Sequence, residues 1–194
     1  MQPTPLWKKI LLEIWDLIKF LTPIAIAVFV IRTWIAQPFI VDGESMAPNF
    51  HTGHYLIIDE LSYHLGQPKR GDVIVLRYPL DTKRFFLKRI VGMPGDRVII
   101  KSGHVYIQND EWTTPTEYRE PYETQYTYQA GPYTDVTLGP DEYFAMGDNR
   151  AGSSDSRAWG ILPRKDIVGH AILRLFPFKL AAITPASVDD FQAK

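Results

Sequence analysis

A serine and a lysine in this chain each lie in a stretch that could support nucleophilic chemistry. Ser45 belongs to the segment GESMAP at residues 43–48, and Lys88 belongs to the apolar run RFFLKRIVGMPGD at residues 84–96. A lysine that points into an apolar interior is desolvated, which lowers its pKa. The neutral amine can then take the proton of a serine hydroxyl. The pair therefore predicts a serine nucleophile with a lysine general base.

The direction of the Lys88 side chain separates this chemistry from a structural alternative. Strand alternation places Phe86 and Lys88 on one face of a strand and Leu87 and Arg89 on the other. A Lys-Arg pair in a strand is most often the solvated side of a sheet edge, where lysine keeps its ordinary pKa. A loop serine is likewise most often a solvated residue, so the local sequence leaves both interpretations open.

The sequence gives little support for a different catalytic nucleophile or for a metal site. It contains no cysteine, which excludes disulfides, thiolate catalysis and zinc–thiolate sites. His51 and His54 have metal-ligand spacing, but no carboxylate or third histidine completes a set, so we expect no metal and no cofactor. A Ser-His-Asp triad can assemble from distant positions, but no histidine has a local context that favours one.

Length and composition allow one domain with a core and a substantial insertion. The chain has 194 residues, of which 45% are hydrophobic, and its formal net charge is -1. Nucleic-acid partners favour a basic face, so the near-zero charge predicts no nucleic-acid binding.

The N-terminal segment predicts a single transmembrane helix. Residues 17–36 are predominantly apolar, with Lys19 and Arg32 near the two ends, and a helix of this length matches a bilayer core of roughly 30 Å. Trp15 and Trp34 lie where interfacial aromatic residues are expected. Basic residues are more numerous before the segment than after it, which places the N-terminus in the cytoplasm and the remainder outside the cell membrane.

Two alternatives to a permanent anchor remain for this segment. A cleavable signal peptide is disfavoured by Pro23, by Arg32 and by the lack of a clean small-x-small site after the apolar core. Residues 6–20 also show helical spacing, which leaves open a buried amphipathic helix of a soluble domain.

The rest of the chain predicts a mainly β fold with antiparallel strands. Short apolar runs at residues 72–78, 143–149 and 166–178 are typical of strands. Residues 97–110 predict a hairpin around the turn Ser102-Gly103. Gly and Pro interrupt these runs often, as in a barrel or sandwich of short strands.

Residues 110–140 differ in composition and predict an inserted surface loop or β subdomain. They contain five tyrosines among charged and polar residues. Tyrosines can stack on nucleic acid bases, but the glutamates at positions 117, 120 and 123 would repel phosphate, so we expect the tyrosines to pack the insertion onto the main sheet. The predicted organisation is a tail and anchor (1–36), a catalytic β domain (37–109 and 141–180), the insertion (110–140) and a C-terminal tail (181–194).

Four motifs occur in a characteristic order. They are QPFIVDGESMAP at 37–48, RGDVIVLRYP at 70–79, KRIVGMPGD at 88–96 and GDNRAGSSDSRAWG at 147–160. In this order and spacing the chain resembles the bacterial type I signal peptidases, in particular the single-anchor, Gram-positive-like form. These are membrane-anchored serine proteases that remove signal peptides from exported preproteins. The resemblance extends from the anchor to about residue 169, with the insertion weakly matched.

The resemblance implies a role for each matching residue. Ser45 matches the nucleophile and Lys88 the general base. Ser153 matches a serine that hydrogen-bonds and orients the lysine amine, and Asp155 and Arg157 match a supporting charged pair behind the site. The backbone N–H of Ser45 would stabilise the oxyanion of the acyl intermediate.

Two positions depart from part of the family. Some members carry a hydroxyl residue two positions before the nucleophile, which helps to form the oxyanion hole, and here that position is Gly43. The second oxyanion donor is therefore unassigned. Phe86 stands where tyrosine is common, which removes a hydroxyl near the lysine and makes its surroundings drier.

The resemblance also implies a substrate site. Shallow pockets would admit small residues at the first and third positions before the cut, the Ala-x-Ala pattern, and an exposed strand would pair with the extended substrate. The implied partners are preproteins and the lipid bilayer. The implied pocket residues are Phe39, Val41, Asp42, Met46, Phe50, Phe86 and Leu87.

Two other functions share some of these sequence features. A self-cleaving, repressor-like Ser-Lys protease shares a β core, but that family is cytoplasmic and carries an N-terminal DNA-binding domain, whereas this N-terminus is apolar. An anchored, non-enzymatic β domain would not need the dyad and its three supporting residues together.

Overall fold

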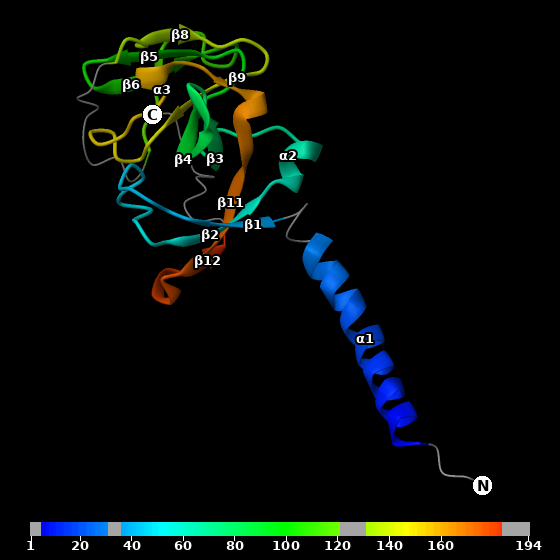
Figure 1. The fold of residues 1–194 in the computed structure, drawn as a ribbon. Coiled ribbons are helices and arrows are strands. Elements are labelled where there is room, and N and C mark those ends of the chain that lie inside the picture. The colour runs from blue at the N-terminus through cyan, green and yellow to red at the C-terminus, as the bar shows by residue number, and fades with distance from the viewer. Residues whose placement is uncertain (1–4, 31–35, 121–130, 184–194) are drawn as a thin grey trace.

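The computed structural model describes residues 5–30, 36–120 and 131–183. A long helix extends away from a body that contains two β-sheets (Figure 1). Apart from this helix, the described elements are mainly antiparallel strands, which agrees with the predicted mainly β fold.

The N-terminal helix α1 spans Leu6–Val30, so it begins well before the predicted membrane segment at residue 17. Helical spacing in residues 6–20 continues directly into the apolar stretch, which joins them in one helix. No helix in the described part of the chain is long and apolar enough to cross a membrane. The predicted transmembrane helix at 17–36 is therefore not confirmed, and its residues 31–35 lie outside the described ranges.

The larger sheet has eight antiparallel strands in the order β1-β2-β11-β3-β4-β9-β10, with β12 beside β11. β4 lies inside this sheet, because it pairs with β3 on one side and β9 on the other. The strands predicted at 72–78, 143–149 and 166–178 correspond to β3, β9 and β11. The bounds are β1 Ala36–Ile40, β2 Tyr55–Asp59, β3 Val73–Tyr78, β4 Asp81–Gly92, β9 Glu142–Met146, β10 Leu162–Pro163, β11 Ile167–Phe176 and β12 Ala182–Ile183.

The smaller sheet has four strands in the order β7-β6-β5-β8. The predicted hairpin is confirmed: β5 and β6 are joined by Ser102 and Gly103, both with positive φ, as a tight hairpin turn requires. β7 and β8 come from the predicted insertion and pair with this hairpin, so the sheet draws strands from both sides of the predicted boundary at residue 110. The bounds are β5 Arg97–Lys101, β6 His104–Gln108, β7 Thr116–Glu117 and β8 Asp135–Thr137.

Short helical turns connect these strands. The α-helices are α2 (Leu61–Leu65) and α3 (Ser156–Trp159), and the 3-10 helices are η2 (Arg164–Asp166) and η3 (Phe178–Leu180). One apolar cluster joins β4 and β9 to the smaller sheet and includes Tyr118 from the predicted insertion. Tyr118 thus packs inward as predicted, whereas Tyr133 is exposed and the other three tyrosines of that stretch lie outside the described residues.

A further apolar cluster supports the segment between β1 and β2, which contains the candidate nucleophile. In it, Met46 and Phe50 pack against side chains of β2 and β3, and both are almost completely buried. Because these two side chains are buried, the backbone on either side of residues 47–49 is held against the core.

Candidate active site

Ser45 lies in a turn that is closed by backbone hydrogen bonds at its base. The N–H of Val41 donates to the carbonyl of His54, and the N–H of Gly53 donates to the carbonyl of Val41, each at 2.9 Å. Gly43 has φ of 102°, a conformation that a glycine adopts without steric cost. The turn therefore presents Ser45 from a backbone held at both ends.

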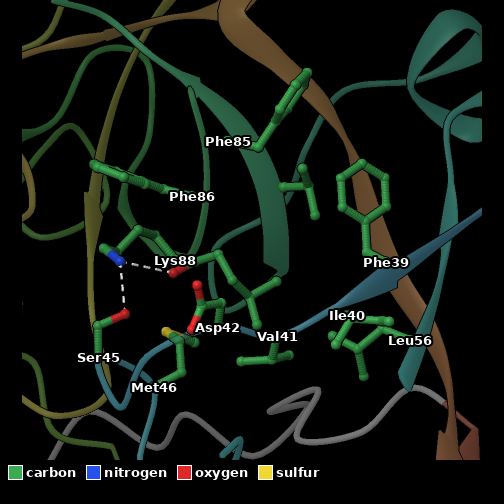
Figure 2. A pocket seen from close by; sticks show the side chains of 12 residues that line it. Phe39, Ile40, Val41, Asp42, Ser45, Met46, Leu56, Phe85, Phe86 and Lys88 are labelled. Carbon is green, nitrogen blue, oxygen red and sulfur yellow. Dashed lines mark hydrogen bonds between the residues drawn. The ribbon is translucent and has the colours of Figure 1, made fainter. Parts of the chain in front are cut away.

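Lys88 comes from the middle of β4 and reaches the nucleophile. Its Nζ donates to Ser45 Oγ at 2.8 Å and to the carbonyl of Leu87 at 2.9 Å (Figure 2). Lys88 is 3% exposed and Arg89 is 0% exposed. The alternative of a solvated Lys-Arg pair at a sheet edge is therefore wrong, because both side chains are buried and this end of β4 lies inside the sheet, between β3 and β9.

Burial lowers the pKa of Lys88 from 10.5 to about 8, and the negative charges of Asp155 and Asp148 oppose this shift. The ammonium loses hydration inside the protein and does not recover it from the nearby carboxylates, which lie behind the site. The Phe86 ring adds an apolar wall, with its centroid 5.1 Å from Lys88 Nζ. A substantial fraction of Lys88 is thus neutral at mildly alkaline pH and able to accept a proton.

The loop after β9 holds the nucleophile turn from behind. The N–H of Asn149 donates to the carbonyl of Ser45 at 3.1 Å, and the N–H of Gly147 donates to Asp155 Oδ2 at 3.0 Å. Asp155 is in turn bound by the Arg157 guanidinium through two contacts of 2.7 Å, and both side chains are buried. The predicted supporting pair is therefore an ion pair that anchors this loop.

Ser153 is buried, but its Oγ has no hydrogen-bond partner among the described residues, so the predicted contact with the lysine amine is absent here. Ser153 lies next to Gly147, and close packing at this point leaves no room for a side chain on residue 147. A Cβ at Gly147 would lie 2.2 Å from Ser153 Oγ and 2.4 Å from the carbonyl oxygen of Ser45. Glycine at this position lets the loop approach the nucleophile turn closely. An orienting role for Ser153 stays a prediction.

A buried ion pair next to the dyad was missed by reasoning from the sequence. Arg89 donates to both carboxylate oxygens of Asp148, at 2.9 and 2.7 Å, and to the carbonyl of Gly71 at 2.7 Å. Asn49 Nδ2, from the nucleophile turn, donates to the same carboxylate at 2.8 Å. Asp148 therefore connects the strand of the lysine to the turn of the serine. Both charged residues lie inside the quoted motifs, which was the available signal.

Glu120 belongs to the same buried region, although its charge suggested a surface position. It is 4% exposed and bonded to Arg150, whose Nε also donates to the carbonyl of Gly147 at 3.1 Å. A carboxylate is buried only when it is paired, and the sequence did not reveal its partner.

An apolar pocket of about 140 Å³ opens beside the dyad (Figure 2). Six of the seven predicted pocket residues line it, and the exception is Phe50, which is fully buried in the core beneath the turn. Phe50 points inward because it follows the turn and joins the cluster of β2 and β3. The lining residues are Phe39, Ile40, Val41, Asp42, Ser45, Met46, Leu56, Val75, Phe85, Phe86, Leu87 and Lys88.

The histidines do not assemble a metal centre in the described ranges, where no group of three His, Asp or Glu side chains has a suitable arrangement. His51, which has ligand spacing to His54, lies with its Nδ1 2.7 Å from Glu44 Oε2. The contact therefore ties the two ends of the nucleophile turn together.

A serine hydroxyl at hydrogen-bonding distance from a buried lysine amine, beside an apolar pocket in an antiparallel β fold, has the geometry of a Ser-Lys hydrolase. The family model described as "Signal peptidase, peptidase S26" matches residues 14–176. The chain belongs to this family of serine endopeptidases, as the four motifs predicted.

Individual members of the family are similar to this chain over most of their length. A probable signal peptidase I-1 of Synechocystis sp. is 32% identical over 176 residues, which cover 84% of this chain and 85% of the relative. The signal peptidase I P of Bacillus subtilis subsp. natto is 34% identical over 167 residues, covering 84% and 89%. A crystal structure of a signal peptidase I from Enterococcus faecalis V583 is 25% identical, with a TM-score of 0.44, covering 54% of this chain and 97% of that one.

Proposed function

We propose that this protein is a membrane-bound signal peptidase that cleaves exported preproteins after an Ala-x-Ala sequence, with Ser45 as nucleophile and Lys88 as general base. The observation that carries the proposal is the 2.8 Å contact between Lys88 Nζ and Ser45 Oγ in a dry environment. Family membership supports the substrate class.

The reaction would proceed in two halves that use the same lysine. Neutral Lys88 takes the proton of Ser45 Oγ as that oxygen attacks the substrate carbonyl, and the resulting ammonium then protonates the leaving amine. This leaves an acyl ester on Ser45. Lys88, again neutral, takes a proton from a water molecule that attacks the ester, and returns it to Ser45 as the acid product leaves. No residue other than the dyad needs to exchange a proton.

The oxyanion of each tetrahedral intermediate would bind the backbone N–H of Ser45. This N–H makes no hydrogen bond to any described residue, so it is free to donate. Gly43 supplies neither a hydroxyl nor a free amide, because its own N–H donates to Thr52 Oγ1 at 2.9 Å. A second donor would therefore come from elsewhere than position 43.

Substrate selection would rest on the small pocket and on an open strand edge. β1 is the terminal strand of its sheet and contributes Phe39 and Ile40 to the pocket. An extended peptide could pair with this edge and place alternate side chains into the pocket. The pocket, of about 140 Å³, has room for a small side chain such as alanine.

The test is cleavage of a preprotein with an Ala-x-Ala site by the full chain in detergent. Exchange of the alanine just before the cut for phenylalanine is expected to lower kcat/KM about a hundredfold, because the proposed specificity requires a small side chain at this position. Absence of cleavage at the alanine site would contradict the function. Equal cleavage of the two substrates would contradict the proposed specificity.

We infer that the lipid bilayer is the second partner, with the N-terminus in the cytoplasm and the catalytic domain outside. Support comes from α1, whose large apolar side chains, among them Leu6, Trp7, Ile26 and Phe29, are exposed. Recovery of the full chain in the soluble fraction of cells without detergent would contradict this part of the proposal while leaving the cleavage test intact.

The lowered pKa of Lys88 predicts how the activity depends on pH. The base must be neutral, so kcat/KM should rise with pH through an apparent pKa of about 8 and level off above it. In acid the ammonium form dominates, and activity about two pH units below the midpoint should fall about a hundredfold. The measurement is kcat/KM across that range, with thermal unfolding followed at each pH. A profile that still rises at about pH 10, the range of an ordinary lysine, would mean that Lys88 is not the desolvated base.

A further inference from the structure

Asp42 is the one charged group in the pocket that the mechanism does not use. Of the twelve lining residues, nine are apolar, and the other three are Ser45, Lys88 and Asp42. Figure 2 shows Asp42 among the side chains that line the pocket, near Ser45 and Lys88. Because Lys88 must be neutral to act as a base, the reactive form of the pocket has a single charge, and that charge is negative.

The Asp42 carboxylate has no structural task among the described residues. It is exposed and makes no hydrogen bond or ion pair there. Neighbouring carboxylates differ in this respect. Glu44 binds His51 and the N–H of Thr52, while Asp148 and Asp155 are buried against arginines. Asp42 is therefore an unpaired anion at the place where a substrate must lie to reach Ser45.

Asp42 is not one of the chief influences on the catalytic lysine. Burial lowers the pKa of Lys88, and the carboxylates that oppose this shift are Asp155 and Asp148. The pH profile of Asp42→Asn therefore separates an effect on the substrate from an effect through Lys88.

We propose that Asp42 is a specificity-determining residue that favours preproteins with a basic side chain next to the scissile bond and disfavours those with an acidic one. The inference rests on the proposed peptidase function and extends it to the charge of the substrate. A bound substrate would displace solvent from the Asp42 carboxylate, so a charge on the substrate would interact with it at short range and with less screening. Repulsion of an acidic side chain contributes to the selection as much as attraction of a basic one.

The experiment uses the full-length protein and peptides that keep the Ala-x-Ala site. Lys, Gln or Glu is placed in turn at position x and at each of the two positions after the cut, and kcat/KM is measured for each peptide. We expect Lys to exceed Glu by about tenfold at one or more positions, with Gln between them. In Asp42→Asn this ratio should fall to about twofold or less. Glu44→Gln is the matched control: it removes a nearby charge outside the pocket, so the preference for Lys should persist.

Three outcomes would overturn the proposal. One is equal cleavage of the Lys and Glu peptides at every position, and another is a preference that survives in Asp42→Asn. The third is a displaced pH midpoint in Asp42→Asn, which would mean that Asp42 acts through Lys88. Failure of the wild-type protein to cleave the Gln peptides would instead contradict the proposed peptidase function, so the two failures are distinguishable.

Discussion

Ser45→Ala and Lys88→Met are each expected to lower kcat/KM on an Ala-x-Ala preprotein by at least about a thousandfold. Alanine at position 45 removes the attacking oxygen. Methionine at position 88 removes the amine 2.8 Å from that oxygen but keeps a side chain of similar length against the Phe86 ring. Members of a catalytic pair act as a unit, so the double variant should be little slower than either single variant.

Lys88→Met also tests whether the loss is chemical or structural. The lysine is 3% exposed, so replacement of its amine by an apolar group should leave the temperature of thermal unfolding unchanged or raise it. Lys88→Arg is a second control, because arginine stays protonated and cannot act as a base. Processing at the wild-type rate by Ser45→Ala or by either Lys88 variant would refute the dyad.

Asp155→Ala is expected to lower the free energy of unfolding by about 3–5 kcal/mol. The substitution leaves the Arg157 guanidinium as an unpaired charge in the interior, where Arg157 is 2% exposed and its Nη1 already lacks a partner among the described residues. It also removes the acceptor of the Gly147 N–H. Chemical denaturation monitored by tryptophan fluorescence would give the difference from wild type.

The chain offers a matched control for this prediction. Arg97 binds Asp135 with the same paired geometry, at 2.8 and 2.7 Å, but the two side chains are 46% and 49% exposed. Asp135→Ala should therefore cost no more than about 1 kcal/mol. If both substitutions destabilise the protein equally, burial of the Arg157–Asp155 pair is not what makes it important.

Local sequence patterns were sufficient for some of the strands, namely β3, β5, β6, β9 and β11, and for naming the candidate dyad. The hairpin at residues 97–110 and the strands β3, β9 and β11 follow from short apolar runs bounded by turn residues, which act over a few positions. Ser45 and Lys88 were identified by four motifs in order, and alternation along one strand predicted that Lys88 and Arg89 point to opposite faces. The family followed from the same motifs and is confirmed.

Other features depended on contacts that no local pattern contains. Alternation places Lys88 and Arg89 on opposite faces of β4, but only the packing of the folded protein shows that both side chains are buried. Phe50 was expected in the pocket and lies in the core, because the direction in which the turn packs is decided by β2 and β3. Residues 17–30 of the expected membrane segment belong to a longer helix, because residues 6–20 continue into them, whereas Ala36 begins β1.

The candidate site shows most clearly which features the sequence alone determined and which features the tertiary structure decided. Their types and order were determined by the sequence alone: a serine in a turn, then a lysine in an apolar strand, then a loop with an acidic residue and an arginine. The lowered pKa of Lys88 was decided by the tertiary structure, because it depends on complete burial beside Phe86. The tertiary structure also decided the Arg89–Asp148 ion pair, because the two residues are distant in the chain. Burial and pairing are properties of the packed protein, whereas motif and periodicity are properties of the chain.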